Sequence, residues 1–138
     1  MLTYNQHTLP RFTFKKKERL SRKKYIQELF NNGSSFFLYP FKVFYLPHNE
    51  EGTPTQWLIS VPKKLHKTAV ARNLIKRRVR EAYRLHKNQI NLSSGKSLFI
   101  AYIYVSNEIL PYEEIENKLN LSFVRLNKEI WNKYYDEV

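Results

Sequence analysis

Residues 68–88 constrain the fold more than any other stretch, because at about 100° per residue they divide into a basic side and an apolar side. The basic side spans an arc of roughly 140° and carries Arg72, Asn73, Lys76, Arg77, Arg80, Arg84 and Lys87. The opposite side carries Val70, Ala71, Leu74, Ile75, Val79 and Ala82. A helix of this kind packs its apolar side on a core and leaves the basic side accessible. Arg78 falls on the apolar side, and we expect it to lie at the edge with its stem extended to water.

Other stretches have the periodicity or composition of regular elements. A helix is expected from Ser21, which can cap it, to Gly33. Residues 36–46, 56–61 and 97–105 are rich in aromatic and β-branched residues and are predicted strands, the first of them split or bulged at Pro40. Apolar spacing over residues 112–135 predicts a final helix. The order α-β-β-β-α-β-α predicts an α+β fold, a single-domain α/β sandwich with three helices on a small mixed sheet of about four strands.

The length and composition favour one domain without a membrane segment. A chain of 138 residues can bury one core and is short for two. Residues 1–13 have turn formers and no periodicity, so we expect a flexible N-terminal arm at 1–13 followed by a domain at 14–138. The sequence has no cysteine, no signal-peptide core and no long apolar run, which favours a cytoplasmic protein.

The basic residues are concentrated in two segments. The chain holds 24 Lys and Arg against 12 Asp and Glu, a net charge of +12. Residues 11–24 contain eight bases and one acid, and residues 63–87 contain ten bases and one acid, so the rest of the chain is acidic on balance. Solvated helix faces usually mix both signs, since like charges one turn apart repel. This excess therefore favours a polyanionic partner.

The aromatic content favours RNA as that polyanion. Arginines can bind phosphate oxygens in pairs, and unpaired bases can stack on exposed rings. The chain has ten Tyr, nine Phe and two Trp, and residues 36–45 carry more rings than one face of a small sheet needs. Most of these rings belong to the core, and whether some line a nucleotide groove is open at this point.

The sequence contains no residue pattern typical of a nuclease active site. The acids are scattered, and four histidines lack the spacing of metal ligands: His7, His48, His66 and His86. Three glycines form no phosphate-binding loop. We therefore expect that the isolated chain cleaves nothing and binds no cofactor on its own.

Residues 60–64 and 69–81 resemble the signature of the bacterial ribonuclease P protein subunit. They read Ser-Val-Pro-Lys-Lys and Ala-Val-Ala-Arg-Asn-Leu-Ile-Lys-Arg-Arg-Val-Arg-Glu. The family pattern runs approximately S-V-x-K-K, a short loop, then A-V-x-R-N-R-x-K-R-x-x-R. The resemblance extends from residue 14 to about residue 134, through the basic N-terminal segment, the aromatic strands and both flanking helices.

The resemblance implies an RNA-binding domain that assists a catalytic RNA in removing the 5′ leader of precursor tRNA, which leaves a 5′-phosphate. Magnesium ions would be held with that RNA, and one protein would bind each RNA. The implied RNA contacts are Lys63, Lys64, Lys67, Arg72, Asn73, Lys76, Arg77, Arg80 and Arg84. A cleft for the single-stranded leader would involve Ile26, Phe30 and Phe44, although ordinary core packing is an equal alternative for Ile26. The family fold also includes a left-handed β-α-β crossover around the basic helix.

The chain departs from the family pattern at three positions. Leu74 stands where the family has a second arginine, but its helical angle points it inward and away from the basic side. Pro62 replaces a small polar residue. Ile26 stands where an aromatic residue is common, which predicts weaker base stacking at that spot.

Two other classes of protein share some of these features. A ribosomal or ribosome-assembly RNA-binding protein would have the same charge and aromatic content, but no reason to prefer RNA that carries a 5′ leader. A protein of the membrane surface would need an exposed apolar face, and the apolar side of residues 68–88 is better explained as core.

Overall fold

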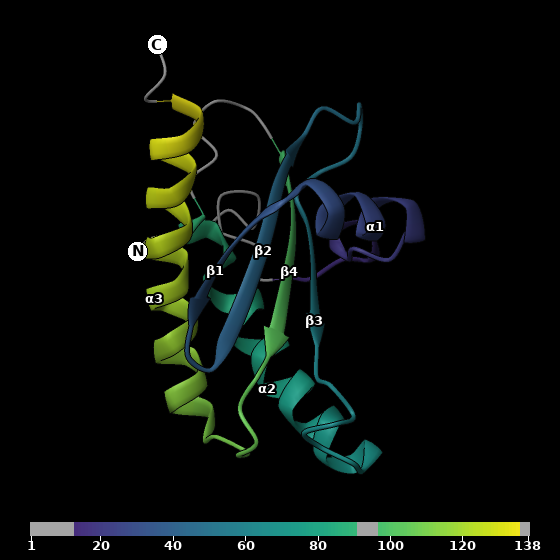
Figure 1. Ribbon diagram of the computed structural model, residues 1–138. Helices are drawn as coiled ribbons and strands as arrows, with labels where there is room; N and C mark the ends of the chain where they lie inside the picture. Colours follow the sequence, from purple (N-terminus) through teal and green to yellow (C-terminus); the bar gives the residue numbers. More distant parts are fainter. Residues whose placement is uncertain (1–12, 91–96, 136–138) are drawn as a thin grey trace, which may run out of the picture.

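The computed structural model describes residues 13–90 and 97–135, and within these it forms a mixed sheet with helices on both faces (Figure 1). The strands are β1 (Ser34–Leu38), β2 (Phe41–His48), β3 (Gln56–Ser60) and β4 (Ser97–Tyr104). The helices are α1 (Lys23–Asn32), α2 (Ala69–His86) and α3 (Tyr112–Ile130), with the short helical turns η1 (Lys16–Glu18), η2 (Lys87–Gln89) and η3 (Trp131–Tyr135). The predicted α+β fold and the order α-β-β-β-α-β-α are confirmed. Of the expected arm at 1–13, only Thr13 belongs to the described residues.

The sheet has the strand order β1-β2-β4-β3, in which only β3 and β4 are parallel. Helix α2 connects these two parallel strands. Both strands run downward in Figure 1, β4 lies to the left of β3, and α2 passes behind the sheet, so the crossover is left-handed. This arrangement is rare among β-α-β units.

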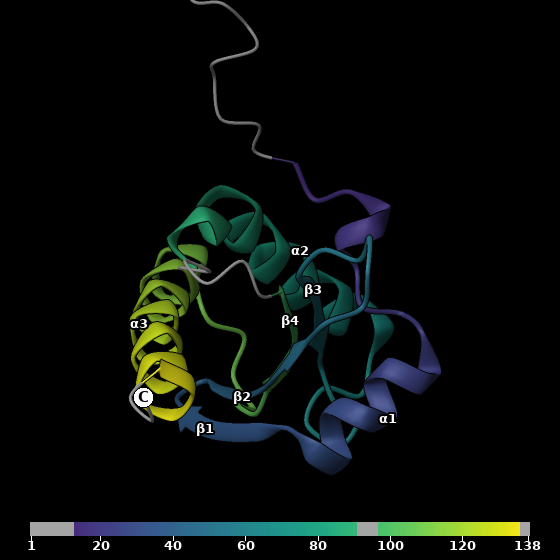
Figure 2. The same ribbon diagram turned by 90° about the horizontal axis from the view of Figure 1, so that it is seen from above.

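Helices α2 and α3 cover one face of the sheet, and α1 covers part of the other face (Figure 2). Strand β4 contributes to the cores on both faces of the sheet. Its alternate residues pack into one core or the other, because successive side chains point to opposite faces. Ile100 and Tyr102 face α2 and α3, whereas Phe99 and Ala101 face α1. A fully buried side chain such as Phe123 of α3 contributes about 1.5–3 kcal/mol relative to an exposed one. The larger core therefore fixes α2 firmly on the sheet.

Three local predictions need correction. Ser21 does not cap α1, because the helix begins two residues later and the N-cap is Arg22, without a side-chain cap hydrogen bond. Val70 does not fill the apolar side of α2: it is 80% exposed. The first turn of α2 lies below the strand ends in Figure 1, so no sheet covers it. Arg78 extends to protein rather than to water, since its Nη1 donates to the carbonyl of Leu110 at 2.7 Å.

Other boundaries agree with the predictions. Thr68 caps α2, and its hydroxyl oxygen accepts a hydrogen bond from the Ala71 backbone N–H at 3.2 Å. Strands β1 and β2 are separated at Pro40, which follows a cis peptide bond. The turn between α1 and β1 needs Gly33, because a Cβ there would lie 2.4 Å from the carbonyl oxygen of Leu29.

Candidate nucleic-acid interface

The outer side of α2 presents three cations without an acidic partner among the described residues. Lys76, Arg77 and Arg80 make no ion pair there, and Lys76 is half-buried while the two arginines are exposed. The inner side packs Ile75, Val79, Ala82 and Tyr83 into the main core. The helix is therefore held rigidly by its apolar side while its charges face outward, which is the arrangement that binds phosphates.

Arg80 faces a second arginine from the N-terminal segment. Burial and the nearby charge of Arg19 both lower the pKa of Arg80. The Arg19 guanidinium lies 5.3 Å from the centre of the Phe14 ring. Both residues line a shallow hollow with Arg77, Arg80 and the Glu81–Arg84 ion pair, so cations outnumber the one acid there. Two guanidinium groups that repel each other beside a ring form a site for an anion. Sequence reasoning left Arg19 out of the contact set, although the basic run at 11–24 pointed to this segment.

The loop before α2 carries three further lysines with no ion pair among the described residues: Lys63, Lys64 and Lys67. Arg72 holds the loop in place, because its Nη1 donates to the carbonyls of His66 at 2.9 Å and Lys67 at 3.0 Å. Arg72 was predicted as an RNA contact, and in this structure one of its nitrogens is engaged within the protein.

Buried His66 fastens the same loop to the end of β4. Its Nε2 lies 2.8 Å from the carbonyl oxygen of Ser106, and the Pro62 carbonyl accepts from the N–H groups of Leu65 and His66 at 3.2 Å each. Pro62 therefore fits a compact turn. His66 was not recognised as a positioning residue from sequence, because its partner lies 40 positions away.

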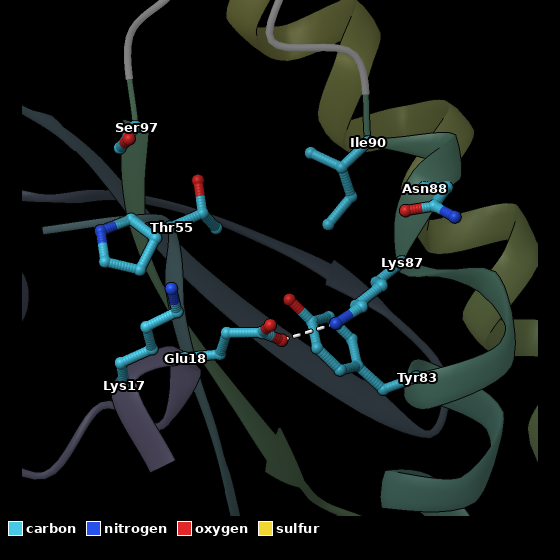
Figure 3. A pocket seen from close by; sticks show the side chains of 9 residues that line it. Lys17, Glu18, Thr55, Tyr83, Lys87, Asn88, Ile90 and Ser97 are labelled. Atoms are coloured by element: carbon cyan, nitrogen blue, oxygen red, sulfur yellow. Dashed lines mark hydrogen bonds and ion pairs between the residues drawn. The ribbon is translucent and has the colours of Figure 1, made fainter. Parts of the chain in front are cut away.

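Two cations on the polar side of α2 are paired within the protein. Arg84 bonds Glu81 through Nε at 3.2 Å, and Lys87 bonds Glu18 and the Thr13 carbonyl. Figure 3 shows Lys87 pointing across a hollow toward Glu18, with the Tyr83 ring beside the pair. The Lys87 pair ties the N-terminal segment to the end of α2. Lys87 is consequently a structural cation, and the accessible basic surface lies nearer the start of the helix.

Asn73 and Leu74 lie where their helical angles predicted. Asn73 is exposed between the cations, as its helical angle predicted. Leu74 is half-buried, which agrees with an inward direction and with its absence from the basic side. The departure at Leu74 therefore leaves the outer row of charges intact.

The three predicted cleft residues lie together on the face of the sheet that α1 covers. Phe30 and Phe44 are in edge contact, with ring centres 4.7 Å apart, and Ile26 packs with Phe44 on the smaller core. Phe30 is 42% exposed, whereas Ile26 and Phe44 are half-buried. Lys42 lies over the Phe44 ring, with Nζ 5.4 Å from its centre. This group of residues thus combines accessible aromatic edges with a cation, as a site for unpaired nucleotides requires.

The described part of the chain offers no metal site. No group of three or more His, Asp or Glu side chains in residues 13–90 and 97–135 is placed to hold a metal ion. His48 and His66 contact backbone carbonyls, and His86 lies against Glu116 with Nε2 and Oε2 2.9 Å apart. These side chains do not fit a magnesium site. Within the same residues, no helix is long and apolar enough to cross a membrane.

A helix with unpaired cations, held on a core, and an accessible aromatic pair on the other face of a small mixed sheet define a basic α+β RNA-binding protein. The sequence matches the family Ribonuclease P over residues 14–127. The chain belongs to the ribonuclease P protein family of bacteria. Its function is accordingly that of the protein component of ribonuclease P, a subunit of an endoribonuclease that acts in tRNA 5′ processing and has an RNA partner.

Individual relatives agree with this assignment. The ribonuclease P protein component of Porphyromonas gingivalis is 36% identical over 121 residues, which cover 85% of this chain and 88% of that protein. The ribonuclease P protein of Staphylococcus aureus has a similar structure, with a TM-score of 0.62, 28% identity, and coverage of 80% of this chain and 95% of that one. The Thermotoga maritima protein has a TM-score of 0.65 at 25% identity, covering 78% and 96% of the two chains.

Proposed function

We propose that two separate surfaces of the chain bind two different RNAs. The basic surface contacts the catalytic RNA and consists of Lys63, Lys64, Lys67, Arg72, Asn73, Lys76, Arg77, Arg80 and Arg84. Of these, Arg84 is paired with Glu81 and would have to exchange that contact for a phosphate. The leader cleft consists of Ile26, Phe30 and Phe44 and holds the single-stranded 5′ leader of precursor tRNA. The observation that carries the proposal is the separation of unpaired cations on α2 from accessible rings between α1 and the sheet.

The basic surface works by neutralising phosphate charge. Each Lys or Arg that contacts a phosphate releases counterions, so binding is strong at low salt and falls as salt rises. Arginines fork onto two phosphate oxygens, which adds orientation to affinity. Because α2 is fixed on the core, its backbone needs no ordering when RNA binds, and only the side chains of its cations lose freedom. The free cations on α2 and its preceding loop supply this contact, and Arg72 also keeps the loop lysines in position.

The leader cleft works by distinguishing substrate from product. Precursor tRNA has a leader that can stack on Phe30 and Phe44, and mature tRNA has none. The cleft therefore adds binding energy to the precursor alone, and product is released without that contribution. In this proposal residues 13–90 and 97–135 supply no acid, base or metal ligand to the cleavage step. Magnesium ions belong with the catalytic RNA in this proposal, because the chain's described side chains do not fit a metal site.

One protein binds one catalytic RNA, the complex is cytoplasmic, and residues 14–138 form the RNA-binding domain behind an arm at 1–13. The net charge of +12 favours association with a large RNA.

Substitutions on the two surfaces test their division of roles. Arg77→Gln should weaken the affinity for the catalytic RNA and leave the ratio of precursor to mature tRNA binding unchanged. Phe30→Ala in the assembled holoenzyme should reduce that ratio by about fivefold or more, since a stacked base contributes about 1–3 kcal/mol. Phe30→Leu keeps the packing against Phe44 and controls for unfolding. If Arg77→Gln lowers the ratio and Phe30→Ala does not, the two surfaces have been assigned the wrong way round.

A further inference from the structure

The edge strand β1 carries an exposed aromatic ring on the same face of the sheet as the leader cleft. Phe36 is buried toward α3, and the next residue, Phe37, points to the opposite face and is 59% exposed. Phe37 pairs directly with Lys42 of β2 in the antiparallel register, and both side chains are exposed. The exposed ring and the amino group therefore lie next to each other on the surface.

The strand register places these two residues at the margin of the cleft. One row across the sheet joins Phe37, Lys42, Ile103 and Ser60, and the adjacent row joins Ser35, Phe44, Ala101 and Leu58. The row of Phe44 packs under α1, whereas no member of the Phe37 row belongs to that core among the described residues. Diagonal neighbours on one sheet face are separated by roughly 7–8 Å. Phe37 thus lies diagonally opposite Phe44 on the same face, outside the part of the sheet that packs against α1.

The chemistry of this row fits an unpaired polynucleotide. The row contains a ring, a cation, an aliphatic side chain and a hydroxyl, and no acid. Lys42 bridges the two rows, because its Nζ lies over the Phe44 ring while its backbone pairs with Phe37. Strand β3 continues from Ser60 into the basic loop with Lys63 and Lys64. A chain of nucleotides leaving the cleft along this row would therefore move toward positive charge.

We propose that Phe37 and Lys42 form an extension of the leader cleft, in which Phe37 stacks on a leader base and Lys42 binds an adjacent phosphate. The extension rests on the proposed role of the cleft. It adds two contacting residues, so that the protein holds a longer stretch of leader than Phe30 and Phe44 can contact. The affinity that a long leader adds then depends on Phe37 and Lys42 as well as on the cleft residues. The alternative occupant of an exposed edge strand is a second protein strand, and the experiment separates the two.

The test measures the binding of precursor tRNAs by the holoenzyme, assembled from this chain and its cognate catalytic RNA. Substrates carry no leader, a leader of about two nucleotides, or one of about ten, a range that spans typical single-strand site sizes. The variants are Phe37→Ala, Lys42→Gln, and Phe30→Ala for the cleft itself. Trp131→Ala removes a similarly exposed ring, 58% accessible, from the end of α3 and is the matched control.

Phe37→Ala should weaken binding of the long-leader substrate by about fivefold or more, and leave leaderless tRNA unchanged. Lys42→Gln should reduce the slope of log affinity against log salt concentration for the long-leader substrate by about 0.7, the value for one single-strand phosphate contact. Trp131→Ala should change neither quantity. Phe37 side-chain removal is not expected to unfold the protein, because the ring is largely exposed.

Three results would overturn the extension. One is equal affinity of the wild type and Phe37→Ala for the long leader. Another is an equal loss for leaderless and long-leader substrates, which would place Phe37 against the tRNA body or the catalytic RNA. A third is a change in the oligomeric state of the free protein with Phe37→Ala and no change in leader binding, which would assign the strand to protein contact. A wild-type holoenzyme that fails to prefer precursor over mature tRNA would instead contradict the proposed function of the cleft.

Discussion

Replacing Arg80 with glutamine should weaken RNA binding without harming the folded protein. Arg80 has no hydrogen bond or ion pair among the described residues, and its pKa is lowered first by burial and then by the charge of Arg19. Glutamine keeps part of the stem and removes the repelling charge. The free energy of unfolding should therefore change by no more than about 0.5 kcal/mol, the usual range for a surface position without specific contacts.

The expected loss in binding follows from counterion release. One phosphate contact contributes about 0.7–0.9 to the slope of log affinity against log salt concentration. The slope for Arg80→Gln should be smaller by that amount. Between about 50 and 200 mM salt, the ratio of wild-type affinity to Arg80→Gln affinity should therefore fall by about threefold. The loss should consequently be largest at low salt. This pattern distinguishes a lost phosphate contact from a general loss of folded protein, which would depend on salt differently.

The assay is a fluorescence titration of the protein against a labelled fragment of the catalytic RNA at several salt concentrations. Lys128→Gln removes one charge from an exposed position on α3 and is the matched control. The slope should fall for Arg80→Gln and stay at the wild-type value for Lys128→Gln. Equal changes in the two variants would mean that net charge alone matters, and an unchanged slope for Arg80→Gln would remove this arginine from the interface.

Three further predictions concern stability and loop order. Gly33→Ala should lower the free energy of unfolding by about 1–3 kcal/mol, since the added Cβ meets the carbonyl of Leu29; equal urea midpoints would contradict this. Burial of His48 lowers its pKa below 6.5, so the unfolded chain takes up the proton first and stability should fall as the pH drops below about 6.5. In His48→Gln the free energy of unfolding should decrease less over this pH range than in the wild type. Identical profiles of unfolding free energy against pH for the two proteins would refute the role of His48. Arg72→Gln should loosen the loop before α2, seen as faster amide exchange at Lys67; unchanged exchange would show that the two carbonyl contacts are dispensable.

The sequence predicted α2 well because its two sides follow from local geometry. Side chains every three or four residues share a face, so the buried positions Ile75, Val79 and Ala82 and the outward cations could be assigned from spacing alone. The cleft residues were predicted from the family resemblance, and their role stays a prediction. The structure brings Phe30 and Phe44 into contact, which their spacing in the sequence could not reveal.

The errors arise where distant segments meet. Val70 is exposed because α2 starts beyond the end of the sheet, and sequence periodicity carries no information about where the sheet ends. Arg78 binds the Leu110 carbonyl, 32 positions away. The approach of Arg19 to Arg80 depends on how the N-terminal segment crosses β3 and α2. Each of these contacts is set by tertiary packing, which overrides the local pattern.

Tertiary packing also decides which aromatic rings are exposed in the candidate site. Ten Tyr and nine Phe made some contribution to RNA binding plausible, but composition did not identify the rings. Burial separates them: Phe41 and Phe99 are core residues, whereas Phe30 and Phe37 remain accessible on the face next to α1. Strand alternation alone would have placed Phe36 and Phe37 on opposite faces without telling which face is open.

The most direct measurement is magnesium-dependent cleavage of precursor tRNA at low salt by the cognate catalytic RNA, with and without this protein. The two-surface proposal predicts marked stimulation by the protein, greater for substrates with a leader that fills the cleft, and no cleavage by the protein alone. Tight binding of the protein to the catalytic RNA without any stimulation would contradict it, and so would cleavage by the protein in the absence of RNA.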